Sequence, residues 1–144
     1  MYRENRLKKM LNEGEKALGC WTSMDNPITT EILAIAGFDF LLIDQEHGYG
    51  DAKGLSIQLQ AMSATNTTSL LRVPNADEAY VKKALDAGTE SLMFPTVNTA
   101  QEARDIVEMC RYAPHGKRGM APGMSSICAA PIVQRLSICS VTSG

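Results

Sequence analysis

The residues best suited to proton transfer lie together in the segment Asp44-Gln45-Glu46-His47, where one imidazole follows two carboxylates. An imidazole titrates near neutral pH, and a carboxylate beside it can fix its tautomer and raise its pKa. This combination predicts a general base, His47, with Asp44 as the acid that orients it. A capped histidine in a loop is the structural alternative, and the residues alone leave both interpretations open.

Arg72 is the second candidate, because it is the one charged residue in the apolar stretch Leu70-Leu71-Arg72-Val73-Pro74. The planar fork of N–H donors on a guanidinium suits a carboxylate or an oxyanion. A salt bridge to Asp44 or Glu46 at the same edge of a sheet is the structural alternative. The two interpretations of Arg72 are compatible with each other.

Two further features are less specific. Trp21, the only tryptophan, lies in a predicted strand, where packing is favoured over lining a pocket, and it is kept as a candidate substrate-binding residue. The segment from Arg111 to Gly119 is basic and rich in glycine. It is either a solvated loop, the approach to a further strand, or a loop on the substrate side.

The elements that must position these residues form four pairs, each a strand followed by a helix. The predicted strands cover residues 17–24, 38–44, 69–73 and 91–97, and the predicted helices cover residues 28–36, 51–64, 76–87 and 100–111. Thr99 and Glu102 match a capping box at the start of the last helix. Gly37 and Gly88 supply helix stops. Residues 1–16 suit a surface helix.

Alternating strands and helices at this spacing predict a parallel sheet, which closes either as an open doubly wound sheet or as a (β/α)8 barrel. No G-x-G-x-x-G or P-loop pattern occurs in the chain, so nucleotide binding is disfavoured. Asp44, Glu46, His47 and Arg72 fall at the carboxyl ends of predicted strands. Enzymes built on barrels place their chemistry at that end.

The composition excludes several classes of protein. The chain has 144 residues with 14 Lys+Arg against 16 Asp+Glu, and this balance argues against nucleic-acid binding. Its short apolar runs argue against a membrane span, and its first residues lack a secretory signal, which predicts a cytoplasmic protein. Four cysteines without C-x-x-C spacing support neither a zinc site nor a disulfide framework.

Five motifs in order along the chain resemble the HpcH/HpaI family of metal-dependent (class II) pyruvate aldolases. They are Gly37-Phe-Asp-Phe-Leu-Leu-Ile-Asp44-Gln-Glu-His47, Leu71-Arg72-Val-Pro74, Lys83-Ala-Leu-Asp86-Ala-Gly88, Phe94-Pro95-Thr-Val97 with Ala100-x-Glu102-Ala103, and Arg111-Tyr112-x-Pro114-x-Gly116-x-Arg118-Gly119. The resemblance runs from about residue 18 to residue 123. It implies that residues 1–123 are the N-terminal half, about four β/α units, of a (β/α)8 TIM barrel.

The resemblance also implies an activity. The family cleaves or forms the carbon–carbon bond of 4-hydroxy-2-oxo acids, giving pyruvate and an aldehyde, and it usually assembles as a hexamer. By resemblance, His47 takes the position of the general base, directly or through a metal-bound water, with Asp44 as its partner. Arg72 binds the C2 oxygen of the 2-oxo acid and stabilises the charge that grows there.

The same resemblance implies a divalent cofactor, Mg²⁺ or Mn²⁺, which needs oxygen ligands. The family's ligands, a Glu on the fifth strand and an Asp after the sixth, fall beyond residue 144, so no metal ligand is assigned in this chain. Glu46 does not match a ligand position. Residues 124–144 diverge from the family pattern and are expected to form a tail outside the fold. The alternative to an aldolase is a non-catalytic truncated half-barrel, inactive or dependent on a partner chain.

Overall fold

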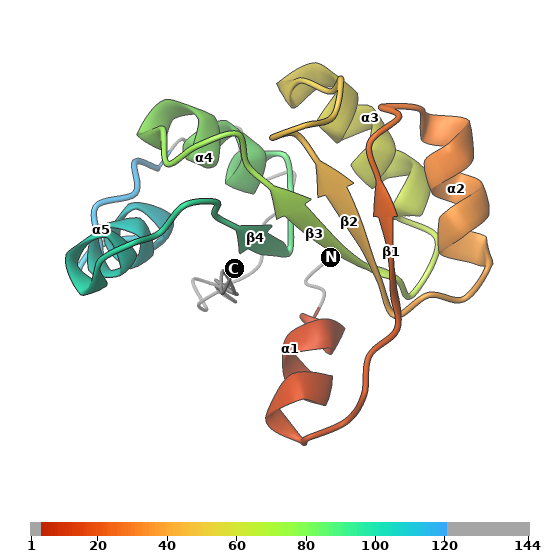
Figure 1. Cartoon of the computed structure of the whole chain (residues 1–144), viewed down its shortest axis with the longest axis horizontal. Helices are drawn as coiled ribbons and strands as arrows, with labels where there is room; N and C mark the ends of the chain where they lie inside the picture. Colours follow the sequence, from red (N-terminus) through yellow and green to blue (C-terminus); the bar gives the residue numbers. More distant parts are fainter. Residues whose placement is uncertain (1–3, 121–144) are drawn as a thin grey trace.

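The computed structural model describes residues 4–120, which form five helices and one four-stranded sheet (Figure 1). In chain order the elements are α1 (Arg6–Asn12), β1 (Gly19–Thr22), α2 (Pro27–Ile35), β2 (Phe40–Asp44), α3 (Ala52–Met62), β3 (Thr68–Arg72), α4 (Glu78–Asp86), β4 (Ser91–Met93) and α5 (Ala100–Cys110). All strand pairs are parallel, in the order β1-β2-β3-β4. The predicted succession of β/α units is therefore confirmed.

Local signals in the sequence account for most helix ends. Asn26 caps α2 through its side chain, and Pro27 occupies the first turn, where its missing N–H costs nothing. The predicted capping box of α5 is present, with Thr99 and Glu102 each accepting from the other's backbone N–H. Gly37 and Gly88 adopt positive φ angles of 93° and 104° after α2 and α4, which is the conformation a glycine stop provides.

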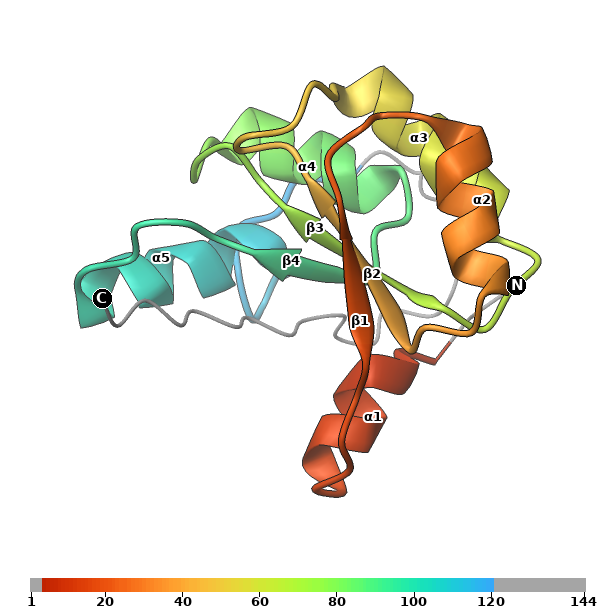
Figure 2. The same cartoon turned by 45° about the vertical axis from the view of Figure 1, so that its right-hand side comes forward.

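The two faces of the sheet are packed differently. Leu41, Ile43 and Leu71 belong to the large core cluster shared with α2 to α5, whereas Leu42 and Leu70 pack with Leu7 of α1. We call the side that carries Leu42 and Leu70 the inner face. Figures 1 and 2 show α1 beyond the amino ends of the strands, apart from the other helices.

The first helix has the amphipathic character that the sequence predicts for a surface helix. Leu7 and Met10 are buried, and Asn5 donates to the carbonyl of Glu90 and to the hydroxyl of Ser91 at 2.8 Å each. Arg6 pairs with Asp39 at 2.9 Å. The helix covers the amino end of the sheet, where Leu7 packs with Leu42 and Leu70 of the inner face.

Two predicted strands are longer than the observed ones. The strand predicted over residues 91–97 ends at Met93, and Thr96 in the following turn has a φ of 53°. The strand predicted over residues 17–24 covers only Gly19–Thr22, and Asp25 after it has a φ of 45°. A left-handed residue is incompatible with an extended strand, so Thr96 excludes the end of the strand predicted over residues 91–97, whereas Asp25 lies beyond the strand predicted over residues 17–24.

The basic segment Arg111–Gly119 folds back onto the ends of two helices. Its Lys117 N–H donates to the Glu108 carbonyl at 2.9 Å, and Arg118 pairs with Asp86 at the end of α4 at 2.6 Å. Each helix runs from the carboxyl end of the sheet back toward the amino end, so this segment lies opposite His47. It is not a loop on the substrate side.

Two sequence-based expectations fall partly outside the described residues. The boundary at residue 123 and the tail 124–144 lie there, as do two of the four cysteines. Cys20 and Cys110 are free thiols. Within residues 4–120, no helix has the length and apolar character needed to cross a bilayer.

Candidate active site

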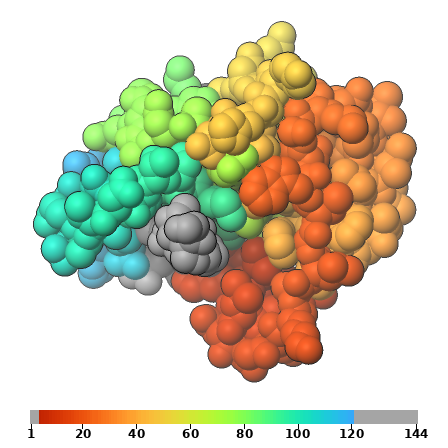
Figure 3. Space-filling model, in the orientation of Figure 1, coloured from red at the N-terminus to blue at the C-terminus, as the bar shows by residue number. Residues whose placement is uncertain are grey.

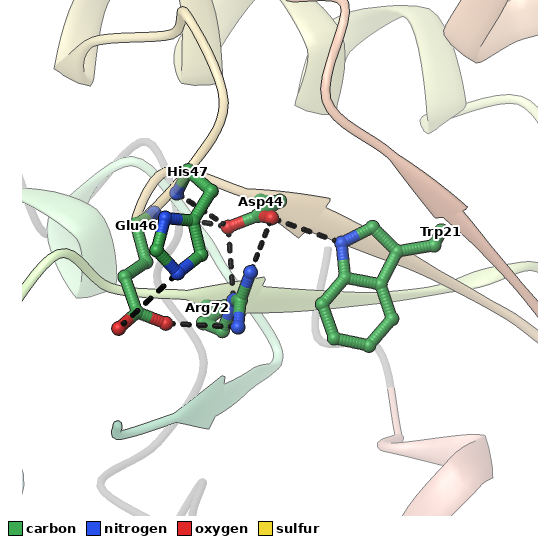
Figure 4. A network of polar contacts seen from close by, with 5 residues as sticks. All are labelled: Trp21, Asp44, Glu46, His47 and Arg72. Atoms are coloured by element: carbon green, nitrogen blue, oxygen red, sulfur yellow. Dashed lines mark hydrogen bonds and ion pairs between the residues drawn. The ribbon is translucent and has the colours of Figure 1, made fainter. Parts of the chain in front are cut away.

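Three neighbouring strands bring Trp21, Asp44 and Arg72 together at the carboxyl end of the sheet (Figure 4). Asp44 is in register with Arg72, and Trp21 is in register with Leu42. Because side chains alternate along a strand, all three fall on the inner face with Leu42. The sheet register therefore places the backbones of these three residues close together.

Asp44 is the hub of this cluster, and its carboxylate is 4% exposed. It accepts from Arg72 Nε at 2.9 Å, from Arg72 Nη2 at 2.5 Å and from Trp21 Nε1 at 3.0 Å. The backbone N–H groups of Glu46 and His47 donate to the same carboxylate at 3.0 and 3.2 Å. Burial alone would raise the pKa of Asp44, but these donors outweigh it and hold that pKa well below its usual range.

Arg72 is fixed from three directions. Besides the two bonds to Asp44, its Nη1 lies 2.8 Å from Glu46 Oε2. Its guanidinium carbon lies 4.7 Å from the centroid of the Trp21 ring, within the range of a cation–π contact. The hydrogen bonds to Asp44 raise the pKa of Arg72 despite its partial burial. The guanidinium is thus permanently charged and held in one orientation.

His47 stands at the outer rim of the cluster. Its side chain is 73% exposed, and its Nε2 lies 3.8 Å from Glu46 Oε1. The predicted partnership with Asp44 takes another form, since the Asp44 carboxylate accepts from the backbone N–H of His47 and is turned toward Arg72 (Figure 4). Glu46 is the carboxylate beside the imidazole, and it also bridges the imidazole to Arg72.

The oxygen donors at this site do not fit a divalent cation. Both carboxylates, Asp44 and Glu46, are engaged by Arg72, and a guanidinium so close repels a second cation. Among residues 4–120 there is no group of three His, Cys, Asp or Glu side chains that could hold a metal ion. We therefore derive no chemical step through a metal.

Comparison with known proteins identifies the family. The model of the HpcH/HpaI aldolase/citrate lyase family matches residues 17–139. The chain belongs to this family. The match begins just before β1 and extends beyond the described residues, so it includes every residue of the cluster around Asp44.

Curated relatives and solved structures of the family agree with this assignment. The hydroxypyruvate/pyruvate aldolase of Roseobacter denitrificans is 41% identical over 81% of this chain and 45% of its own length. The 4-hydroxy-2-oxovalerate aldolase of Rhodococcus jostii is 42% identical over 85% of this chain and 48% of its own. A family member from Burkholderia cenocepacia superposes with a TM-score of 0.78 at 38% identity, covering 82% of this chain and 49% of that structure.

The chain thus spans about half the length of the curated relatives it matches. The solved family members are TIM-barrel aldolases, so its four β/α units correspond to about half of such a barrel. The predicted fold class is confirmed. Both of these relatives are named as aldolases, which are carbon–carbon lyases.

Trp21 differs from its favoured interpretation as a packing residue. Trp21 is 53% exposed, and its indole N–H binds Asp44, so packing in the core is not its role. The predicted salt bridge of Arg72 is present with both Asp44 and Glu46. Since the guanidinium also faces the open end of the sheet, the two interpretations of Arg72 remain compatible.

Sequence reasoning missed Gln45 and Tyr80. Gln45 is buried, its Oε1 accepts from the Tyr80 hydroxyl, and its Nε2 donates to the Asp51 carbonyl at 2.8 Å. The only signal in the sequence is the alternation along β2, which turns Gln45 toward the helices when Asp44 faces inward. Tyr80 lies 35 positions away, and no local pattern connects the two.

Proposed function

We propose that this chain binds a 2-oxo acid at the Trp21–Asp44–Arg72 cluster and carries the proton-transfer and enolate-stabilising part of a pyruvate aldolase. The carrying observation is a guanidinium fixed by two carboxylates beside an exposed imidazole, at the carboxyl end of a parallel sheet. The substrates proposed are 4-hydroxy-2-oxo acids, cleaved to pyruvate and an aldehyde. The relatives named as aldolases support this choice.

Arg72 would bind the C2 oxygen of the substrate. A guanidinium has five N–H donors, and three of them are directed at Asp44 and Glu46. The remaining donors are available for an oxygen on which negative charge grows during enolisation. Because the carboxylates and the Trp21 ring fix the guanidinium beforehand, it need not reorganise as the charge develops.

His47 would move the proton. In the cleavage direction the imidazole accepts the proton of the C4 hydroxyl, the C3–C4 bond breaks, and its electrons form the enolate whose oxygen faces Arg72. Protonation at C3 then gives pyruvate. An exposed imidazole can accept and return a proton, and Glu46 at 3.8 Å is placed to stabilise its protonated form.

The family resemblance implies Mg²⁺ or Mn²⁺ as a Lewis acid, together with a hexameric assembly and a cytoplasmic location. We keep these as predictions for the whole protein. Because Asp44 and Glu46, the two carboxylates at this site, are engaged by Arg72, the proposed steps involve only this chain's own residues.

The test is proton exchange at the methyl group of pyruvate in D₂O, followed by NMR with Mg²⁺ supplied in the buffer. We expect loss of the methyl signal faster than in buffer with Mg²⁺ alone, and we expect the excess rate to vanish in His47→Ala. Exchange that equals the buffer rate, or that persists in His47→Ala, contradicts the proposal.

A second candidate is a non-catalytic half-barrel that needs a partner chain to work. One observation favours it: the described residues offer no group that could hold a metal ion. The same experiment separates the candidates. A folded chain without exchange supports the half-barrel, whereas exchange that depends on His47 supports the enzyme.

A further inference from the structure

The loop between β2 and α3 carries Glu46 and His47, yet little holds the His47 side chain itself. The imidazole has Glu46 at 3.8 Å and is largely exposed. Its position therefore depends on the backbone of residues 45–51. Contacts of neighbouring side chains hold that backbone in place.

Gln45 fastens both ends of this loop from the helix side of the sheet. Its side chain is buried, and its Nε2 donates to the carbonyl of Asp51 at 2.8 Å, joining the first residue of the loop to the cap of α3. Its Oε1 accepts from the hydroxyl of Tyr80 on α4. Asp44 performs the matching task on the inner face, through the backbone N–H groups of Glu46 and His47.

Tyr80 suits the role of a permanent donor. Burial, together with the nearby carboxylates of Asp51 and Asp25, raises the pKa of its hydroxyl, so the O–H stays protonated. Its ring packs against the large core cluster. The hydroxyl is thus anchored on α4 and reaches across to the loop that follows β2.

The other side of the loop rests on Asp25. A Cβ at Gly54 would lie 2.2 Å from Asp25 Oδ1, and a Cβ at Gly50 would lie 2.8 Å from Gln45 Nε2 and 3.0 Å from Asp25 Oδ1. Gln58 of α3 donates to the same Asp25 oxygen at 2.7 Å. The loop at Gly50 and the first turn of α3 at Gly54 therefore lie close against the Asp25 side chain, and Gly50 also lies close to Gln45. In the space-filling view the orange and yellow segments that bear these loops lie against each other (Figure 3).

We propose that Gln45 and Tyr80 are positioning residues, which hold the Glu46–His47 loop so that the imidazole stands beside the guanidinium of Arg72. They act through the backbone and do not touch substrate. The consequence for catalysis rests on the proposed function. A misplacement of a reacting group by about 1 Å costs on the order of 100-fold in rate, so a clamp that fixes a loop matters to an otherwise unrestrained base.

The test compares Tyr80→Phe, which keeps the ring and removes the donor, with Tyr112→Phe as the matched control at the other end of the sheet. Amide hydrogen exchange in residues 46–50 is expected to rise about fivefold in Tyr80→Phe, the factor that corresponds to one lost hydrogen bond. The NMR shifts of the His47 imidazole are expected to move. Those of His115 and the exchange rates in α5 are expected to stay unchanged.

In the pyruvate exchange assay, kcat of Tyr80→Phe is expected to fall about tenfold with KM within about twofold, because Arg72 is untouched. If the chain shows no exchange activity, the proposed function fails, while the imidazole shifts and amide rates still decide the positioning role. The positioning role would be overturned by unchanged NMR shifts of the His47 imidazole, or by a uniform rise of the amide exchange rates throughout the chain.

Gln45→Met is the second variant, needed in case Tyr80→Phe does not fold. It removes both hydrogen bonds of the Gln45 side chain and leaves a flexible apolar side chain of similar length. The same rise in residues 46–50 and the same change at His47 are expected. The double variant Gln45→Met/Tyr80→Phe should be no worse than Gln45→Met, since the shared bond is already gone, and additive losses would contradict the clamp.

Discussion

Two arginines in this chain have the same kind of surroundings, a carboxylate partner and an aromatic ring, but they lie at opposite ends of the sheet. Arg72 pairs with Asp44 and lies 4.7 Å from the Trp21 ring, whereas Arg118 pairs with Asp86 at 2.6 Å and lies 4.5 Å from the Tyr112 ring. An ion pair stacked on an aromatic ring is thus a structural unit that this protein uses twice. The unit alone does not mark a site of chemistry.

The two arginines differ in the other groups that lie beside them. Arg72 lies on a strand end with a second carboxylate and an imidazole beside it. Arg118 joins the segment after α5 to the end of α4, and its Nε is buried without an acceptor among the described residues. Arg72 thus lies beside an imidazole at the carboxyl end of the sheet, whereas Arg118 joins two segments at the other end.

The largest difference is expected in stability. Asp44→Asn leaves the guanidinium of Arg72 without its main partner in a buried cluster, and we expect a loss of about 3 kcal/mol in the free energy of unfolding. Asp86→Asn changes a carboxylate that is more exposed than Asp44, 16% against 4%, and should cost about half as much. Urea denaturation followed by circular dichroism measures both. Equal losses would show that the Arg72–Asp44 and Arg118–Asp86 ion pairs contribute equally to stability.

Activity should separate the two arginines by a similar free energy. Lysine cannot hold two carboxylates in the planar fork of a guanidinium, and loss of a fixed oxyanion donor costs about 100-fold or more in rate. Arg72→Lys should therefore lower His47-dependent pyruvate exchange by that factor. Arg118→Lys serves as the control and should leave the rate per folded molecule within about twofold. A large loss in both variants would place neither arginine at the chemistry.

Acid should reduce the stability that the Asp44 carboxylate contributes. The pKa of Asp44 is held well below its usual range, so its contribution to stability is complete above the unfolded value of about 3.9. It declines as the pH falls from there toward the folded pKa. Wild type should thus lose more unfolding free energy than Asp44→Asn between pH 5 and pH 2. Parallel curves for the two proteins would contradict the depressed pKa.

The sequence predicts the fold where the signals are local. The run Phe38 to Asp44 reads as a buried parallel strand, and the helix ends at Asn26 and Thr99 are set by their own side chains. The residues against which Leu7 packs could not be predicted, because Leu42 and Leu70 are distant from it in the sequence. The left-handed conformation of Thr96, within the strand predicted over residues 91–97, is not signalled by any β propensity.

The site is predictable to the same extent. Residues that end neighbouring parallel strands must lie together, so the meeting of Asp44 and Arg72 follows from the element order. The partner of the imidazole does not follow, since His47 lies past the strand end, where alternation no longer fixes a direction. The contact between Gln45 and Tyr80 joins a loop to another helix, and only the tertiary fold brings them within reach.

The smallest expected effect concerns the aromatic rings. Trp21→Phe keeps a ring over Arg72 but removes the N–H that Asp44 accepts at 3.0 Å, and we expect a loss of about 1 kcal/mol in the free energy of unfolding. Tyr112→Phe keeps its ring over Arg118 and should change stability by less than about 0.5 kcal/mol. Because Trp21 is half exposed, its loss should also raise KM for pyruvate if the ring contacts substrate. A stability change without a change in KM would assign Trp21 to the support of Asp44 alone.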